Sequence, residues 1–404
     1  MQSVLGTKNC FGCGVCAAVC PKKIIKIELN TDGFYVPTIA NSSDCTNCGL
    51  CNKVCSFKND DAFPDKRNLR SYAAWSRNQS VREKSSSGGI AFEIGKSLIA
   101  QGYMVCGVRY NAKNKRAEHY IANTLDELVP SMGSKYIQSY TVDAFRKINR
   151  MQKYLIVGTP CQIASFRRYI RKFQCEENFV LMDFFCHGVP SYFAWEKYIR
   201  EVEKKTGPIV NVSWRNKRTG WRDSWMETCD ESDSYEKVDW HDSYFIKIKG
   251  EKGLHCSRMT QGDAFYKLFL GDQCLGKACY DSCKFKSNHS LADIRVGDAW
   301  GHIYENNDEG VSAVISFTTK GDDVVHSCDC EVREHSFELA TEYQMKTNAK
   351  RNFSHKKLMK LLRDENEGLE DVMRYVCFTR RISRQIERVK HPLRTIKNII
   401  GFFK

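Results

Sequence analysis

Eight cysteines lie in two evenly spaced runs within the first 55 residues of this 404-residue chain. The first run is Cys10-Phe-Gly-Cys13-Gly-Val-Cys16-Ala-Ala-Val-Cys20, and the second is Cys45-Thr-Asn-Cys48-Gly-Leu-Cys51-Asn-Lys-Val-Cys55. Both runs have the spacing C-x₂-C-x₂-C-x₃-C, by which thiolates hold a 4Fe–4S cluster. Three close cysteines of a run bind one cluster, and the fourth cysteine reaches across to the other cluster.

The spacing therefore predicts two 4Fe–4S clusters in residues 1–60, each held by three cysteines of one run and one of the other. The expected sets are Cys10, Cys13, Cys16 and Cys55 for one cluster, and Cys45, Cys48, Cys51 and Cys20 for the other. The usual proline, Pro21, follows the first run, but Ser56 follows the second. Structural zinc and disulfides are the alternatives, although zinc would favour ligands in two pairs.

Composition agrees with a metal-binding or redox role for these cysteines. Apolar residues make up 42% and charged residues 27% of the chain, as in soluble globular proteins. The length predicts two or three domains. No apolar stretch is long enough to span a membrane, and residues 1–6 lack the features of a secretory signal. We therefore expect a cytoplasmic protein, in which disulfides are rare and clustered cysteines bind metal.

The net charge of +14 is concentrated at the C-terminal end. Residues 378–404 hold eight Lys or Arg against one acid, Glu387, and so supply +7 of that total. The rest of the chain is only mildly basic, which argues against a nucleic-acid groove. Apolar residues at helical spacing between these cations are Ile382, Ile386, Val389, Leu393, Ile396 and Ile400. This spacing predicts a helix that is interrupted at Pro392. The helix could contact an anionic inner-membrane surface. We favour the alternative, in which it packs on the body of the protein.

An α/β region follows the cysteine runs. Residues 103–110, 154–157 and 179–185 have the composition of strands, and residues 162–172 and 192–204 have helical patterns. Strands that alternate with helices imply right-handed crossovers and a mostly parallel sheet. The polar residues 56–70 indicate a linker, residues 211–260 show no clear periodicity, and helices are expected from about residue 341 onward.

Two of the predicted strands end in turns that carry reactive side chains. One strand leads into Gly158-Thr-Pro-Cys161-Gln162, and the other leads into Cys186-His187-Gly188. Ligands of parallel sheets bind beyond the carboxyl ends of the strands. If the two strands are neighbours, Cys161, Cys186 and His187 share one rim, with His187 as the candidate proton donor. The alternative is that these residues only shape tight turns.

Two further segments offer cofactor or metal contacts. Ser85–Gly89 precedes a helical pattern and would present N–H groups and hydroxyls to a phosphate, unless it is an ordinary helix cap. Ser134-Lys135-Tyr136 could add a cation and a stacking ring. A third cysteine group, Cys274, Cys279 and Cys283, could ligate a further cluster or zinc if Cys161 or Cys186 completed it.

Together these segments resemble the beta-subunit family of coenzyme F420 hydrogenases and dehydrogenases, which includes formate dehydrogenase beta subunits. Besides the cysteine runs, the matching pieces are Ser85–Gly89, Gly133–Tyr136, Gly158–Gln162, Phe185–Gly188 and Asp293–Gly301. The resemblance implies an iron–sulfur flavoprotein with FAD in the α/β body, where Cys161 and Cys186 border the flavin or a cluster. The cofactor contacts it implies are Ser86, Ser87, Gly88, Gly89, Lys135, Gly158, Thr159, Pro160 and Gln162.

We thus predict an α+β ferredoxin-like two-cluster domain at 1–60, an α/β region at 71–150 and 151–340, and a helical basic tail at 341–404. The predicted function is electron transfer between the clusters and FAD, to reduce or oxidise an unidentified small molecule. A flavin suits this role because clusters carry single electrons whereas organic substrates usually take a hydride. The resemblance also makes surface-polysaccharide metabolism conceivable. The alternative is an electron-transfer subunit that docks a separate redox protein and has no substrate of its own.

Overall fold

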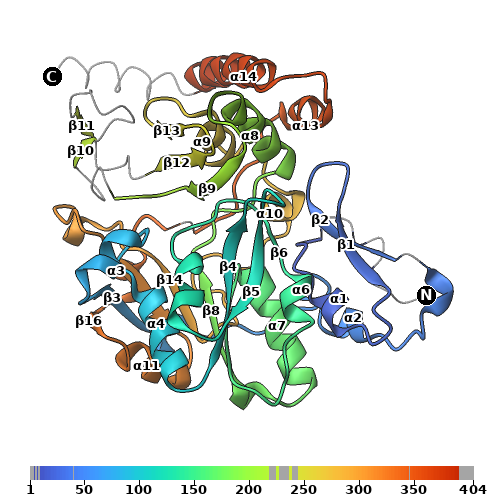
Figure 1. The fold of residues 1–404 in the computed structure, drawn as a ribbon, viewed down its shortest axis with the longest axis vertical. Helices are drawn as coiled ribbons and strands as arrows, with labels where there is room; N and C mark the ends of the chain where they lie inside the picture. The colour runs from blue at the N-terminus through green and yellow to red at the C-terminus, as the bar shows by residue number, and fades with distance from the viewer. Residues whose placement is uncertain are drawn as a thin grey trace.

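A computed structural model describes residues 4, 7, 10–39, 41–217, 224–226, 236–238, 244–344 and 346–390 of the chain. The N-terminal module lies beside a central sheet, and a smaller sheet and the C-terminal helices lie at one end of that sheet (Figure 1). The predicted linker contains one short 3₁₀ helix, η2 (Lys66–Asn68), but it begins with Ser56, which is almost completely buried.

The N-terminal module contains two short helices and a hairpin. Its elements are α1 (Val15–Val19), β1 (Ile25–Leu29), β2 (Tyr35–Ile39), η1 (Ser42–Asp44) and α2 (Leu50–Lys53). Strands β1 and β2 pair antiparallel. Each helix starts after a glycine with left-handed backbone, Gly14 at φ 75° and Gly49 at φ 69°, a conformation that only glycine adopts at little cost. The sequence repeat is therefore also a structural repeat.

The central sheet has nine strands in the order β16-β3-β15-β14-β8-β7-β4-β5-β6 among the described residues. Their bounds are β3 (Arg70–Ser76), β4 (Met104–Asn111), β5 (Arg116–Ala122), β6 (Ser139–Tyr140), β7 (Tyr154–Val157), β8 (Phe179–Phe184), β14 (Ile294–Asp298), β15 (Ser312–Ser316) and β16 (Cys330–His335). The three strands predicted from the sequence are β4, β7 and β8, and they are adjacent and parallel.

The sheet is mixed rather than mostly parallel, which corrects the prediction. Strand β14 is parallel to β8, but β15, β3 and β16 pair antiparallel on one side, and β5 pairs antiparallel with β4 on the other. The β4–β5 connection is a short turn at residues 112–115, and a connection of that length can only join antiparallel strands. Parallel pairing is thus found mainly at the centre, where helices make the crossovers.

Helices cover both faces of the sheet. Those around it are α3 (Gln79–Lys84), α4 (Ile90–Ala100), α5 (Leu125–Leu128), η3 (Val129–Ser131), α6 (Val142–Phe145), α7 (Pro160–Lys172), η4 (Glu176–Asn178), η6 (His302–Tyr304), α11 (Thr319–His326) and α12 (Phe337–Ala340). Alternate side chains of β7 point to opposite faces, as strand geometry requires. Tyr154 and Ile156 pack with α7, whereas Leu155 packs on the α4 side.

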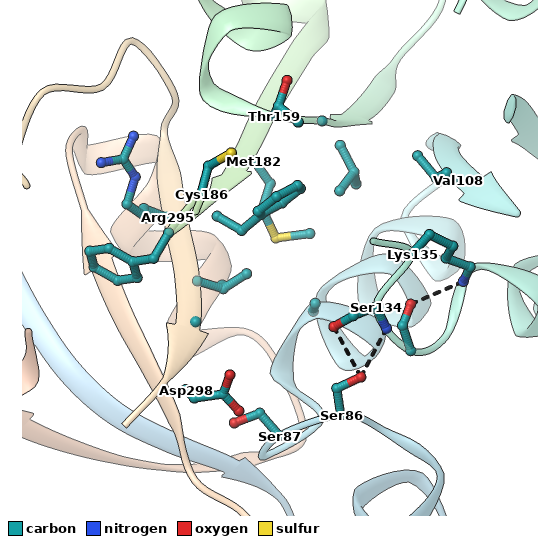
Figure 2. A pocket seen from close by; sticks show the side chains of 18 of the residues that line it. Ser86, Ser87, Val108, Ser134, Lys135, Thr159, Met182, Cys186, Arg295 and Asp298 are labelled. Atoms are coloured by element: carbon teal, nitrogen blue, oxygen red, sulfur yellow. Dashed lines mark hydrogen bonds between the residues drawn. The ribbon is translucent and has the colours of Figure 1, made fainter. Parts of the chain in front are cut away.

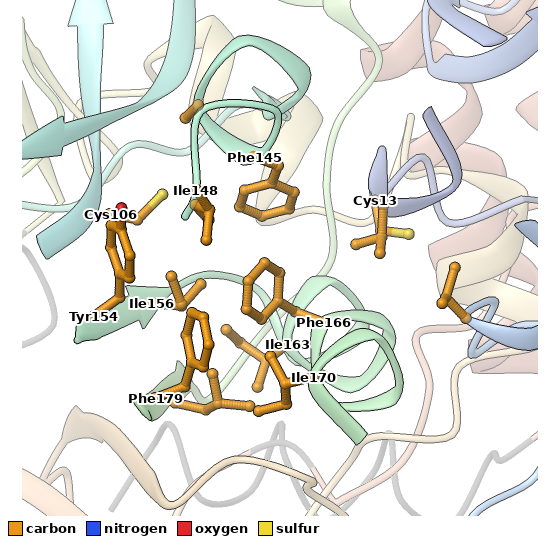
Figure 3. Packing of buried hydrophobic residues seen from close by; sticks show 14 of the residues in the cluster. Cys13, Cys106, Phe145, Ile148, Tyr154, Ile156, Ile163, Phe166, Ile170 and Phe179 are labelled. Carbon is orange, nitrogen blue, oxygen red and sulfur yellow. The ribbon is translucent and has the colours of Figure 1, made fainter. Parts of the chain in front are cut away.

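The core on the α7 face continues into the N-terminal module. Cys13 and Val15 of that module belong to the same buried cluster as Phe145, Phe166 and Ile156 of the body. Figure 3 shows Cys13 at the edge of this cluster, beside Phe145 and Phe166. The module is therefore packed on the body through a shared core.

The segment that showed no periodicity contributes a smaller sheet of order β13-β12-β9. The elements here are α8 (Tyr192–Thr206), β9 (Ile209–Ser213), β10 (Ser224–Met226), β11 (Glu236–Val238), β12 (Phe245–Gly250), β13 (Leu254–Arg258), α9 (Ala264–Phe269) and α10 (Lys277–Asp281). Trp195 and Trp214 are fully buried between this sheet and α8.

The chain ends in two helices, α13 (His355–Arg363) and α14 (Leu369–Lys390). Val372 and Val376 are buried in a cluster with residues of α8 and α13, so the first turns of α14 pack on the body. They precede the basic segment 378–404, and the packing that we favoured for that segment stays a prediction. Phe378 is 60% exposed. The predicted break at Pro392, together with Leu393, Ile396 and Ile400, lies outside the described residues. Within the described residues, no helix is both long and apolar enough to cross a membrane.

Candidate functional site

The structure brings together the first predicted set of thiols, which we term the inner thiol set (Cys10, Cys13, Cys16 and Cys55). All four line one small cavity between α1 and the module's hairpin. Cys13 and Cys16 are buried, and burial raises the pKa of Cys10 to about 12 and that of Cys13 to about 11. Burial is the larger cause, and the neighbouring thiols of the set contribute to the same shifts. Such mutual repulsion arises where several sulfurs share one space, which is the requirement for a cluster site.

The second predicted set, the outer thiol set (Cys20, Cys45, Cys48 and Cys51), lies nearer the surface. Cys48 is exposed and the other three are half-buried. Burial raises the pKa of Cys51, and the nearby thiols of Cys48 and Cys20 add to that shift. The Cys45 Sγ atom lies 3.8 Å from Asn47 Oδ1, in the turn before α2.

A third group of thiols gathers at the ends of β7 and β8, and we term it the body thiol set (Cys161, Cys186, Cys279 and Cys283). All four line a cavity of about 430 Å³. Each of Cys161, Cys186 and Cys279 has its pKa raised mainly by burial and further by other thiols of the set. A buried thiol with a raised pKa is a poor nucleophile, so the arrangement favours ligation over covalent catalysis.

Cys274 does not belong to this group, which corrects the predicted composition of the third site. Its side chain is fully buried and donates to Leu268 O at 3.7 Å, within a cluster that includes Leu268 and Val372. Cys279 and Cys283 are retained, and both Cys161 and Cys186 join them. Across the described residues, no three His, Cys, Asp or Glu side chains converge closely enough to hold a single metal ion.

A second large cavity, of about 490 Å³, lies against the body thiol cavity and has the size of a cofactor site. Of the nine predicted cofactor contacts, seven line it: Ser86, Ser87, Gly89, Lys135, Gly158, Thr159 and Gln162. Pro160 lines the body thiol cavity instead. Gly88 lines neither cavity, because it packs on β3, where a Cβ would clash with Ala74 O.

The serine loop that opens this cavity is held from two sides. Ser86 Oγ accepts hydrogen bonds from Ser134 N at 2.9 Å and from Ser134 Oγ at 3.1 Å, as Figure 2 shows. On the other side, Lys217 Nζ donates to Ser87 O. The loop ends at Gly89, whose φ of 92° turns the chain into the 11-residue helix α4, and Gly89 and the first residues of α4 line the cavity. A helix start of this kind suits an anionic group.

Lys135 has a different role from the predicted one. Its Nζ contacts the backbone carbonyl oxygens of the preceding turn at 2.8–3.0 Å, namely those of Pro130, Ser131, Met132 and Gly133. Burial lowers the pKa of this ammonium to about 7. Four carbonyls already surround its three hydrogens, so Lys135 shapes the turn rather than offering a free cation.

Gln162 and Thr159 fix the turn between β7 and α7. Gln162 Oε1 accepts from Thr159 N at 2.9 Å in a capping box, and Gln162 Nε2 donates to Ser139 Oγ at 3.1 Å.

His187, at the end of β8, also lines the cavity. Its Nε2 lies 2.8 Å from Asp272 Oδ1, although the two atoms are not aligned as a hydrogen bond. Because β7 and β8 are adjacent, Cys161, Cys186 and His187 share one rim, as predicted.

Two charged pairs, each with one member that lines the cavity (Arg295 and Asp298), were missed by sequence reasoning. Arg295 forms a bidentate ion pair with Asp183 at 2.7 and 2.8 Å, and both side chains are almost fully buried. Arg215 is paired with Asp298 at 2.7 Å, and its guanidinium also faces the Trp300 ring at 5.2 Å. Figure 2 shows Arg295 and Cys186 on one side of the cavity and Ser86 and Lys135 on the other. Charged pairs so distant in sequence leave no local signal.

Comparison with known proteins agrees with the geometry. Residues 71–146 and 151–334 match the models of the N-terminal and C-terminal parts of the coenzyme F420 hydrogenase/dehydrogenase beta subunit. The chain belongs to this beta-subunit family. Residues 9–59 match the 4Fe–4S dicluster domain, so the beta-subunit body carries an iron–sulfur ferredoxin-type domain.

Among solved structures, a similar one is the xenon-derivatised F420-reducing NiFe hydrogenase complex from Methanosarcina barkeri. The identity is 16%, the alignment covers 74% of this chain and 94% of that one, and the TM-score is 0.45. No match is found among curated proteins.

In this beta-subunit chain the three cavities form a series. The small cavity of the inner thiol set and the body thiol cavity share Cys10 in their walls. The body thiol cavity and the large cavity share Cys186, Thr159 and Gln162. Adjacent cavities with common walls are the arrangement that stepwise electron transfer needs, because each cofactor then lies close to the next.

Proposed function

We propose that this protein is an iron–sulfur flavoprotein oxidoreductase that passes electrons between its ferredoxin-type clusters and FAD. The observation that supports this most directly is the series of three cavities. One is lined by the four thiols of the inner set, the next by the four thiols of the body set together with Cys10, and the third by the serine loop and the start of α4. Family membership gives the same reaction class, because the matched family contains hydrogenases and dehydrogenases.

Three 4Fe–4S clusters fit the thiol sets. The inner and outer sets have the ligand spacing of a two-cluster ferredoxin, and each inner thiol faces one shared cavity. The body thiol set would hold a third cluster between the module and the large cavity. Thiolates are the protein ligands that iron–sulfur clusters require, and four thiols line the body cavity.

The large cavity would hold FAD. Its phosphates would meet the N–H groups at the start of α4 and the Ser86 and Ser134 hydroxyls, while apolar side chains such as Val108 and Met182 line the interior. When bound, FAD supplies the exchange between single-electron and hydride chemistry. His187 lines the large cavity and lies on the rim formed by the ends of β7 and β8. It is therefore the side chain best placed to hold a proton for a substrate.

Anaerobic purification followed by iron, sulfide and flavin quantification tests this proposal. We expect roughly twelve iron atoms per chain, four for each cluster, and one FAD. Cys279→Ser should lower the iron content by roughly four atoms, because it removes a ligand of the body thiol set. Cys274→Ser is the matched control, since Cys274 lies a few residues away but points into the core, and it should keep all the iron. Colourless wild-type protein without iron would overturn the proposal.

The exposed outer thiol set favours a second candidate function, an electron-transfer subunit that serves a separate catalytic protein. Cys48 is exposed, so a cluster held there would lie close to a docked redox partner. The two candidates differ in what oxidises the reduced protein. If the reduced protein turns over a small acceptor, and His187→Ala slows that turnover, the oxidoreductase is supported. If only a co-purified partner oxidises the reduced protein, and His187→Ala leaves that rate unchanged, the electron-transfer subunit is supported.

A further inference from the structure

Two buried serines join the ferredoxin-type module to the body. Ser56 follows Cys55, the last cysteine of the second run, and Ser165 lies on α7; their exposed fractions are 2% and 1%. The two hydroxyl oxygens lie 2.7 Å apart, and Ser56 N–H also donates to Ser165 Oγ at 3.2 Å. A proline usually follows the run at the position of Ser56, and it would supply neither the N–H nor the hydroxyl.

Each serine also contacts a residue of a thiol set. Cys13 Sγ, of the inner set, lies 3.2 Å from Ser165 Oγ. Ser56 Oγ donates to the backbone carbonyl of Cys161, of the body set, also at 3.2 Å. A continuous line of hydrogen-bonded atoms thus runs from the sulfur of one thiol set to the backbone of the next.

The hydrogens of this line can be assigned once Cys13 is a thiolate. The free thiol donates to Ser165, but a cluster-bound thiolate can only accept. The Ser56 hydroxyl hydrogen lies between Ser165 Oγ at 2.7 Å and the Cys161 carbonyl at 3.2 Å, and Ser165 Oγ also accepts from Ser56 N–H. The Ser165 hydroxyl hydrogen is then left for the Cys13 sulfur. Every donor in the line has an acceptor, so loading of the cluster needs no rearrangement of the serines.

We propose that Ser165 and Ser56 form a bridge that donates a hydrogen bond to the inner cluster through Cys13 and thereby raises its reduction potential. The inference rests on the proposed function, because it requires a cluster in the inner thiol set. A hydrogen bond to a ligand sulfur stabilises the additional negative charge of the reduced cluster. Ser165 is held in place because its neighbours on α7, Ala164 and Phe166, are fully buried. Both serines are positioning residues.

Redox titration of Ser165→Ala, followed by electron paramagnetic resonance, measures this effect. We expect the midpoint of one cluster to become more negative by the order of a tenfold change in its reduction equilibrium, ~59 mV for one electron. Ser56→Ala keeps the Ser165 hydroxyl and should shift the same midpoint less. Thr141→Ala is the matched control: Thr141 Oγ1 donates to Cys13 O at 3.0 Å, so this variant removes a hydrogen bond at the same ligand without involving its sulfur. Its midpoints should stay at the wild-type values.

The outcomes separate this inference from the proposed function. Fully loaded Ser165→Ala protein with unchanged midpoints would overturn the bridge and leave the proposed function standing. Wild-type protein without clusters would overturn both. If Ser165→Ala does not assemble the inner cluster, electron–nuclear double resonance on the wild-type protein in H₂O and D₂O decides. Gly12 N–H donates to Cys10 Sγ at 3.3 Å and accounts for one exchangeable proton. A second exchangeable proton at hydrogen-bond distance from the inner cluster supports the bridge, and its absence from the wild-type protein overturns it.

Discussion

The inner and outer thiol sets have the same ligand spacing and different surroundings. Each run places a left-handed glycine before a short helix, with φ 75° at Gly14 and 69° at Gly49. Yet Cys13 and Cys16 are buried, whereas Cys48 is exposed. The local sequence thus produces the same fold twice, and the difference must come from what lies against each copy.

The body of the protein supplies that difference. Helix α1 packs against α6 and α7, and Thr141 donates to Cys13 O at 3.0 Å. Arg146 adds hydrogen bonds to Ala17 O and Ile25 O at 3.3 and 2.9 Å. A cluster in the inner set would therefore be shielded from water by the body, and solvent exposure is one of the factors that set a cluster's potential. A cluster in the outer set would meet solvent or a partner protein.

Loss of a ligand should break this comparison most clearly. Cys16→Ser and Cys48→Ser should each lower the iron content by roughly four atoms per chain. Cys16 is 7% exposed and packs with Ile25 and Val142, so its variant also weakens the contact with the body. We expect the thermal unfolding midpoint to fall by roughly 10 °C or more for Cys16→Ser, and by only a few degrees for Cys48→Ser. The unfolding midpoints are measured by circular dichroism at matched iron content. Equal decreases of the midpoint in the two variants would show that the two sets contribute equally to packing against the body.

Substitution of the two glycines gives a smaller and better matched test. Alanine at either position costs about 1–2 kcal/mol for the left-handed backbone. At Gly14 the added Cβ would also clash with Thr141 Oγ1, which costs about 1–3 kcal/mol more for overpacking. At Gly49, among the residues that the structure describes, no atom outside its neighbours lies within 4 Å of the added Cβ. Denaturant unfolding should therefore show a larger loss for Gly14→Ala than for Gly49→Ala, and similar losses would contradict the docking described here.

Much of this architecture could be predicted from local sequence. Cysteine spacing predicted that the inner thiol set comes together, and its four thiols do line one cavity. Strand β7 was predicted with the bounds it has, Tyr154–Val157. The shared rim of Cys161 and Cys186 also followed, because adjacent parallel strands end at the same edge. In each case a short-range pattern determines the feature.

The errors concern side chains whose direction is decided only in the folded chain. Cys274 looks like a partner of Cys279 in sequence, but its side chain enters the core below α14 rather than the cavity. Lys135 offers a cation in sequence, but the fold encloses its ammonium in the carbonyls of its own turn. Ser165 gave no signal, because a serine within a helix usually bonds its own backbone, and here Ser56 takes the Cys161 carbonyl instead.

A buried histidine beneath the inner set allows the finest test of the comparison. His119 Nε2 lies 2.9 Å from Val157 O, and its ring packs edge-on against Phe145, which belongs to the same cluster as Cys13. Burial lowers the pKa of His119 to about 4. As the pH falls below 6.5 the unfolded state takes up a proton that the folded state refuses. Stability is therefore full above pH 6.5 and is lost progressively as the pH falls toward 4.

Between pH 7.5 and 5.5 this linkage should remove about 1 kcal/mol of the free energy of unfolding. His119→Phe cannot titrate, so its loss over the same range should be smaller by that amount. Ile148→Val provides the control, because it changes the packing of the same buried cluster without removing a titratable group and should keep the wild-type pH dependence. Since His119 supports only the inner side of the module, mild acid should release iron from the inner cluster faster in the wild-type protein than in His119→Phe. An identical pH dependence in all three proteins would show that the core beneath the inner set does not sense the charge of His119.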